Sequence, residues 1–260
     1  MPNSHGRFVW HELVTSNVDA AASFYAQVAG WKTQPGDFDP EYTMWVKDAT
    51  PLGGLMALGS DLESRKVKPH WLPYVYVYDV DACTRQVKTL GGQVRLGPHE
   101  VPNVGSWSVI SDPHGAIIGL YEPEAKVPSE DHRPRGGEFS WHELGTMDYK
   151  AAFAFYHALF GWEKTSEADM GDMGDIGAYF MFGKRGLAYG GMFNRRPDMP
   201  PPNWLSYILV DSVQSAVDGV KRLGGVVHRG PMDVPGGPTI AICSDPQGAM
   251  IAFQGRPATG

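Results

Sequence analysis

The hexapeptide FVWHEL at residues 8–13 returns as FSWHEL at residues 139–144, and this repeated stretch decides the fold. The likeness extends well beyond it on the C-terminal side. Further pairs of segments match in the same order along the chain: 14–31 with 145–162, 53–58 with 190–195, 69–102 with 202–235, and 111–120 with 244–253. Self-similarity of this kind indicates a duplication, so the chain contains two copies of one structural repeat.

Each copy is predicted to fold as a strand, a helix and three strands, followed by the same order again. The alternation in RFVWHEL (7–13) predicts a strand, and Asn17 is a typical helix-start residue. Apolar residues then recur at helical spacing up to the helix-stop residue Gly30. The second helix is predicted to be capped by Asp79 or Asp81. The aromatic pairs Phe24–Tyr25 and Phe155–Tyr156 have the spacing of core residues.

A charged, Pro- and Gly-rich segment separates the two copies. Residues 124–137 have the composition of a linker, which predicts one domain over residues 1–123 and a second over residues 138–260. The whole chain has 260 residues, 42% of them apolar, which suits two domains with sizeable cores.

Charge and composition exclude several classes of protein. A net charge of −7 without a Lys/Arg run argues against nucleic acid or an anionic membrane as a partner. The chain has no apolar stretch long enough to span a membrane, and its first residues lack a signal-peptide core. Two cysteines cannot form a disulfide framework. We therefore expect a cytoplasmic protein, either a monomer whose two domains act as a pseudo-dimer or a homodimer.

The repeated elements resemble the vicinal oxygen chelate superfamily, which includes glyoxalase I, bleomycin-resistance proteins, fosfomycin-resistance enzymes and extradiol dioxygenases. The motifs that carry the resemblance are FYAQVAGW (24–31) and FYHALFGW (155–162) after the first strand, and DPHG (112–115) and DPQG (245–248) before the last. The resemblance implies an α+β fold with two tandem domains. Each would consist of paired βαβββ units that form an open, curled mixed sheet around a cavity.

Metal-using members of this family hold the ion with a His on the first strand, a second ligand on the strand that opens the next unit, and a Glu on the last strand. These positions fall on Trp10, Leu72 and Gly119 in the first copy, and on Trp141, Leu205 and Ala252 in the second. None of these side chains offers a useful metal donor. We therefore predict no cofactor, with a divalent metal as the alternative.

His11 and His142 stand one residue beyond the expected ligand position. Successive side chains on a strand face opposite sides, so the shift turns both imidazoles away from the cavity. The sequence favours structural or interface histidines, and their role stays open. The set His11, His70 and Glu122 is a weaker, off-register alternative for a metal site.

Strand alternation also predicts what faces the cavity. Aromatic and aliphatic side chains dominate the predicted ligand-binding residues, which are Trp10, Leu72, Tyr74, Tyr76, Tyr121, Trp141, Leu205 and Tyr207. Glu12 and Glu143 share this face, and desolvation by aromatic neighbours raises the pKa of a carboxyl group toward neutrality. Both are candidate catalytic acid/base residues, with Tyr74 or Tyr207 as hydrogen-bond donor to the ligand. Alternatively, each Glu is a structural residue paired with a basic or backbone group.

The predicted partner is a small, largely apolar or aromatic organic molecule in an aromatic-walled cavity. A metal-independent lyase, isomerase or oxygenase-type enzyme would use Glu12 or Glu143. A protein that sequesters a drug or metabolite without catalysis would need only the aromatic walls. A third alternative is a metal-dependent lyase or dioxygenase that uses off-register ligands.

Overall fold

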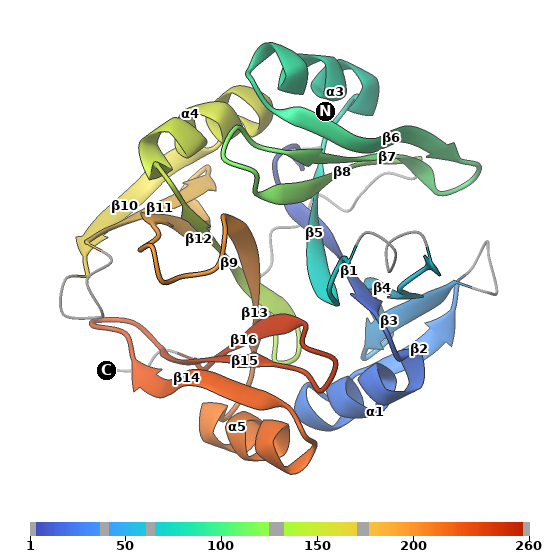
Figure 1. Ribbon diagram of the computed structural model, residues 1–260, viewed down its shortest axis with the longest axis vertical. Coiled ribbons are helices and arrows are strands. Elements are labelled where there is room, and N and C mark those ends of the chain that lie inside the picture. The colour runs from blue at the N-terminus through green and yellow to red at the C-terminus, as the bar shows by residue number, and fades with distance from the viewer. Residues whose placement is uncertain (1–3, 37–41, 61–65, 125–132, 171–176, 257–260) are drawn as a thin grey trace. The chain divides into compact units, whose positions relative to one another are not determined.

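The computed structural model describes residues 4–36, 42–60, 66–124, 133–170 and 177–256. These residues form two mixed sheets of eight strands each, in the orders β2-β3-β4-β1-β5-β8-β7-β6 and β10-β11-β12-β9-β13-β16-β15-β14 (Figure 1). The strands of the first sheet are β1 (Phe8–Thr15), β2 (Lys32–Pro35), β3 (Thr43–Lys47), β4 (Thr50–Ala57), β5 (His70–Tyr76), β6 (Gln93–Val101), β7 (Gly105–Ser111) and β8 (Ile117–Pro123). Those of the second are β9 (Phe139–Thr146), β10 (Glu163–Asp169), β11 (Ala178–Lys184), β12 (Leu187–Asn194), β13 (Asn203–Leu209), β14 (Val226–Asp233), β15 (Thr239–Ser244) and β16 (Met250–Gln254).

The helices begin where the sequence predicts. Within the described ranges, the structure gives bounds for α1 (Val18–Val28), α3 (Val80–Thr89), α4 (Tyr149–Phe160) and α5 (Val213–Arg222). The Asn17 side chain accepts a hydrogen bond from the backbone N–H of Ala20, and Asp79 does the same for α3, so Asp79 rather than Asp81 is the cap. The α+β class and the paired βαβββ units are thus confirmed.

Each sheet is formed by one copy of the sequence repeat, whereas each compact unit of the structure contains residues of both copies. The first unit consists of residues 1–9, 73–132 and 141–204, and the second of residues 10–72, 133–140 and 205–260. The first unit therefore contains nearly all of β5–β8 and β9–β12, and the second nearly all of β1–β4 and β13–β16. Each unit combines one βαβββ half from each copy of the duplication.

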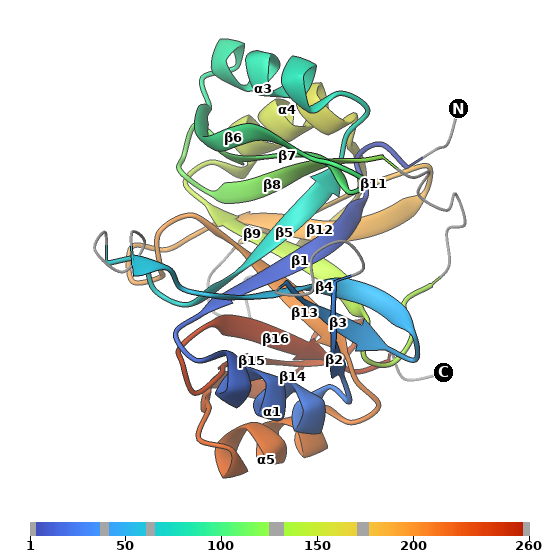
Figure 2. The same ribbon diagram turned by 90° about the vertical axis from the view of Figure 1, so that its right-hand side faces the viewer.

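Each unit has its own apolar core, to which both copies contribute. In the second unit Phe24 and Tyr25 of α1 and Val217 of α5 are buried in one cluster, and the two helices lie side by side (Figures 1 and 2). In the first unit, Val87 of α3 and Phe155 of α4 are buried together in the same way. The prediction that the Phe–Tyr pairs are core residues is confirmed.

A buried hydrogen-bond network joins the copies within each unit. In the second unit the Tyr25 hydroxyl donates to Asp245 Oδ2 at 3.2 Å and accepts from the Trp71 indole N–H at 2.8 Å. Asp245 Oδ1 accepts from the backbone N–H groups of Gln247 and Ala249, which fixes the DPQG turn.

The first unit repeats the network in the DPHG turn. The Tyr156 hydroxyl donates to Asp112 Oδ2 at 3.1 Å and accepts from the Trp204 indole N–H at 3.1 Å. Burying an aspartate is tolerated here because its oxygens are hydrogen-bonded. The turn motifs that carry the family resemblance therefore anchor one copy of the repeat to the other.

Among the described residues, no helix is both long and apolar enough to cross a membrane.

Candidate functional site

A carboxyl group, a phenol and an indole meet on the half-sheet β1–β4 in the second unit. The Tyr42 hydroxyl donates to Glu12 Oε2 at 2.8 Å. The Trp10 indole N–H lies 3.3 Å from Glu12 Oε2 and 3.1 Å from the Tyr42 hydroxyl, so it donates to both. Trp10 and Glu12 are two residues apart on β1, which places their side chains on the same face. We refer to these three residues as the Glu12 cluster.

Glu12 is a buried acid whose two oxygens have different surroundings. Its side chain is 7% exposed, and Oε1 is buried without a hydrogen-bond partner among the described residues. Burial raises the pKa of Glu12 from 4.5 to about 7, while the hydrogen bonds from Tyr42 and Trp10 act in the opposite direction. Near neutral pH Glu12 can therefore both give and take a proton.

Glycine at position 54 makes room for this cluster. Gly54 lies opposite Glu12 on the parallel neighbour β4. A Cβ atom at residue 54 would overlap with the Tyr42 hydroxyl and with Glu12 Oε1. The two polar groups thus converge over a backbone position that has no side chain.

The second copy builds the same arrangement in the first unit, which we call the Glu143 cluster. The Tyr179 hydroxyl donates to Glu143 Oε2 at 2.9 Å and accepts from the Trp141 indole N–H at 2.8 Å. Gly191 lies opposite Glu143, and a Cβ there would overlap with the Tyr179 ring. Glu143 is half-buried, in contrast to the buried Glu12.

Tyr42 and Tyr179 were not predicted as site residues. Tyr42 directly precedes β3 and Tyr179 lies near the start of β11, so strand alternation around Glu12 does not reveal them. The signal that could have found them is the recurrence of Tyr-x-Met in YTM (42–44) and YFM (179–181), just before the matched GG strands.

The remaining predicted ligand-binding residues are divided between the two units. In the first unit the Tyr74 ring occupies the space that a Cβ on Gly119 would need, and the Tyr121 hydroxyl donates to the Val104 carbonyl. Tyr76 is half-buried in the same unit, while Leu72, Leu205 and Tyr207 are buried in the second. Their contact with a ligand, including a donor role for Tyr74 or Tyr207, stays a prediction.

His11 and His142 stack on phenylalanines of the other copy. The ring centroids of His11 and Phe139 are 3.6 Å apart in the second unit, and those of His142 and Phe8 are 3.6 Å apart in the first. Burial lowers the pKa of His142 from 6.5 to about 3, so its imidazole is neutral near pH 7. Both imidazoles are therefore packed against aromatic rings, in a structural setting.

The family's metal ligands do not fit the corresponding positions of the first copy. The indole nitrogen of Trp10 is a hydrogen-bond donor to Glu12 and Tyr42 and has no lone pair to offer. Leu72 is buried and apolar, and at Gly119 the Tyr74 ring fills the space of a side chain. None of these three residues provides the N, O or S donor that a metal ion needs.

The residues of the off-register alternative each have another contact. His70 Nδ1 lies 2.8 Å from the Lys68 carbonyl, and Glu122 Oε2 accepts a hydrogen bond from the backbone N–H of Val80 at the start of α3. His11 is stacked on Phe139. Within the described ranges, no group of three or more His, Cys, Asp or Glu side chains could hold a metal ion.

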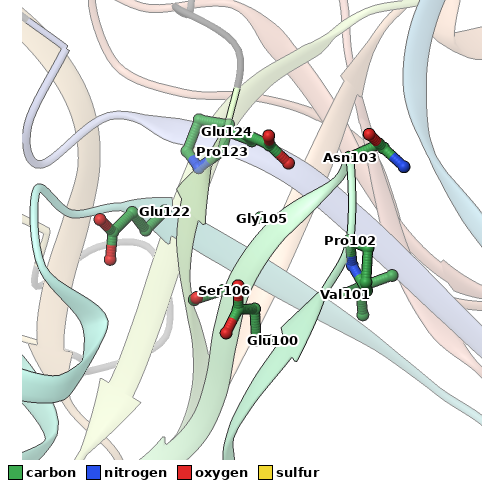
Figure 3. A pocket seen from close by; sticks show the side chains of 9 residues that line it. All are labelled: Glu100, Val101, Pro102, Asn103, Gly105, Ser106, Glu122, Pro123 and Glu124. Carbon is green, nitrogen blue, oxygen red and sulfur yellow. The ribbon is translucent and has the colours of Figure 1, made fainter.

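A separate pocket of about 490 Å³ lies in the first unit between the ends of β6, β7 and β8. Its acidic lining residues are Glu100, Glu122 and Glu124. Figure 3 shows their carboxyl groups pointing in different directions, and Glu122 is engaged at the start of α3. The pocket therefore lacks the converging groups of a catalytic or metal site.

The state of Glu12 leads to a prediction about stability and pH. Because the pKa of Glu12 is about 7 in the fold against an ordinary 4.5, the folded protein binds more protons than the unfolded chain between these values. Its contribution to stability is complete below pH 4.5 and is lost as the pH rises to about 7. Between pH 4.5 and 8, the free energy of unfolding should thus fall by about 3 kcal/mol more in the native protein than in Glu12→Gln.

Urea denaturation at several pH values measures this difference. The matched control is Glu100→Gln, which makes the same chemical change at an exposed position on β6 and should run parallel to the native protein. Equal pH dependence of the native protein and Glu12→Gln would contradict a buried, protonated Glu12.

Comparisons with known proteins agree with this architecture. Residues 7–120 and 139–253 each match the profile of the Glyoxalase/Bleomycin resistance protein/Dioxygenase superfamily. The Mycobacterium bovis protein named "Putative glyoxylase CFP32" is 30% identical over 250 residues, which cover 94% of this chain and 92% of that protein. The "Anthracycline biosynthesis protein DnrV" of Streptomyces peucetius is 29% identical over 280 residues, with 97% and 96% coverage.

Among solved structures, the Mn(II)-bound glyoxalase from Novosphingobium aromaticivorans has a TM-score of 0.66 at 16% identity, covering 98% of this chain and 83% of that one. At this identity the likeness shows the fold alone. The profile match, by contrast, spans both copies of the repeat, including the FYAQVAGW and FYHALFGW motifs and both DP-x-G turns. The chain therefore belongs to the glyoxalase/bleomycin resistance protein/dioxygenase superfamily.

Proposed function

We propose that the protein binds a small, flat, largely apolar organic molecule against its Trp–Tyr–Glu clusters. Glu12, and Glu143 in the second copy, act on this ligand as acid/base groups without a bound metal ion. One observation carries the proposal: the Glu12 carboxyl group is buried beside an indole and a phenol, and its Oε1 has no hydrogen-bond partner among the described residues.

The chemistry of the cluster supports an aromatic ligand. Trp10 is half-buried, so part of its indole can stack on a flat ring, while Tyr42 and Glu12 provide the few polar contacts that fix an orientation. A carboxyl group whose pKa lies near the ambient pH is suited to proton transfer. The poor fit of the family's metal ligands at Trp10, Leu72 and Gly119 supports chemistry that relies on side chains alone.

The name of one relative supports a ligand of this kind. It is named for the biosynthesis of anthracyclines, and anthracyclines are built on flat, fused rings. A chain with similar repeats and two aromatic carboxyl clusters is well suited to a ligand of that general shape.

Solvent exchange of a carbon acid tests the acid/base role. The probe is 2-tetralone, a flat bicyclic ketone whose α-protons exchange for deuterium when the α-carbon loses a proton to form the enol or enolate and takes up deuterium from the solvent. A base at the α-carbon or an acid at the carbonyl oxygen accelerates this step. We expect the native protein in D₂O to accelerate this exchange above the buffer rate, as followed by proton NMR. The double variant Glu12→Gln/Glu143→Gln should reduce the protein-dependent part by about 10²-fold or more, while Glu100→Gln should leave it unchanged.

Parallel measurements separate the alternatives. Binding of 2-tetralone is followed by quenching of tryptophan fluorescence, with Trp10→Ala and Trp141→Ala as site variants and Trp107→Ala, on β7 in the first unit, as control. Binding without exchange would favour a sequestering protein over an enzyme. Loss of exchange on treatment with EDTA, with recovery on adding a divalent metal, would contradict metal independence.

A further inference from the structure

The two oxygens of Glu12 have different hydrogen-bond partners, and this difference carries information about the ligand. Oε2 accepts from both Tyr42 and Trp10, at 2.8 and 3.3 Å. Oε1 is buried, lies over Gly54 and has no partner among the described residues. A buried polar atom without a partner is costly unless another group completes it.

A neutral Glu12 with its proton on Oε1 keeps both hydrogen bonds that Oε2 accepts from Tyr42 and Trp10. Among the described residues, Tyr42 is the titratable side chain that is hydrogen-bonded to Glu12, Gly54 faces Glu12 from β4, and Trp10 donates to it from its own strand. None of these groups is a cation that would offset an ionised carboxylate in this place.

We propose that Glu12 recognises a carbonyl-type oxygen on the flat ligand by donating the Oε1 proton to it, as a preference specific to the Glu12 cluster. This inference rests on the proposed function and specifies its ligand as an aromatic ketone or quinone. Such an oxygen accepts a hydrogen bond and has no proton to give, so it complements an O–H group that lacks an acceptor.

The Glu143 cluster lacks the feature that creates the preference. Glu143 is half-buried, so water reaches it and competes with a ligand oxygen for its hydrogen bonds. Its indole neighbour Trp141 donates at 2.8 Å to the Tyr179 hydroxyl. The Glu12 cluster should therefore bind a ligand with a carbonyl oxygen more tightly than the same ligand without it. The Glu143 cluster should bind the two ligands about equally.

Two probes of nearly the same shape test the inference. 9-Fluorenone and fluorene are flat tricycles that differ by a carbonyl in place of a methylene group. Their binding to the native protein is measured by tryptophan fluorescence at pH 6 and pH 9. At pH 6 we expect fluorenone to bind on the order of tenfold more tightly than fluorene, and this ratio should fall toward one at pH 9 as Glu12 ionises.

Two substitutions of Glu12 give opposite expectations. Glu12→Gln keeps an acceptor for Tyr42 and Trp10 and offers an N–H in place of the Oε1 proton, so the preference should persist at both pH values. Glu12→Met removes the donor and should abolish the preference at both. Glu100→Gln and Glu100→Met, at an exposed position outside both clusters, are the controls and should leave the ratio as in the native protein.

The outcomes separate this inference from the proposed function. Equal binding of both probes, with loss of binding in Trp10→Ala, would overturn the carbonyl preference and leave a flat-ligand site in place. A preference that is lost in Glu143→Met, or one that survives Glu12→Met, would also overturn it. Binding of neither probe would overturn both proposals.

Discussion

Residues 1–124, produced without the rest of the chain, are expected not to fold as a monomer. The core of the second unit needs both α1 from the first copy and α5 from the second, and the core of the first unit needs both α3 and α4. The fragment has one helix of each pair, so it would leave two apolar half-cores exposed. The loss of either partner surface removes the burial that stabilises a small core.

Circular dichroism and urea denaturation measure this effect. The isolated fragment should lack a cooperative transition, or should associate in a concentration-dependent manner so that a second copy of the fragment covers its apolar faces. Production together with residues 125–260 is the matched control and should restore a single soluble complex with a cooperative transition. A monomeric 1–124 fragment with native near-ultraviolet dichroism would contradict the mixed cores.

The substitution Asp245→Ala is expected to be among the most damaging single changes. It would leave the buried hydroxyl of Tyr25 and the N–H groups of Gln247 and Ala249 without their acceptor. We expect a loss of about 3–5 kcal/mol in the free energy of unfolding, the range found when one partner of a buried polar network is removed.

Two further variants calibrate this result by urea denaturation. Asp211→Ala makes the same change at an exposed position and should cost about 0.5 kcal/mol or less. Asp245→Asn keeps an acceptor oxygen and should recover more than half of the loss. Equal stability of Asp245→Ala and Asp211→Ala would contradict a stabilising role for this hydrogen-bond network.

The sequence predicts the elements of this fold well because the duplication supplies each pattern twice. Asn17 and Asp79 are recognisable caps, and the placement of Phe24 and Tyr25 in the core follows from helical spacing alone. The DP-x-G motifs predict the turns before the last strands. Glu12 follows from strand alternation, since it shares a face with Trp10 and not with His11.

What the sequence could not predict is which copy packs against which. The two copies present nearly equivalent apolar helix faces, so periodicity cannot tell whether α1 packs against α3 or α5. For the same reason, the stacking of His11 on Phe139 could not be read from the local pattern. Tyr42 was not predicted because it reaches Glu12 from the residue before β3, and the pairing of neighbouring strands is not encoded in the spacing along one of them.

The crossing of the two units over the repeats bears on how such a chain can change over time. Because each apolar core contains residues of both copies, the loss of one copy would leave the other with two incomplete cores instead of one intact fold. The helices and turns of both must therefore be retained together, even when a ligand is handled at a single cluster. One Trp–Tyr–Glu cluster is then free to acquire new chemistry while its duplicate serves as scaffold.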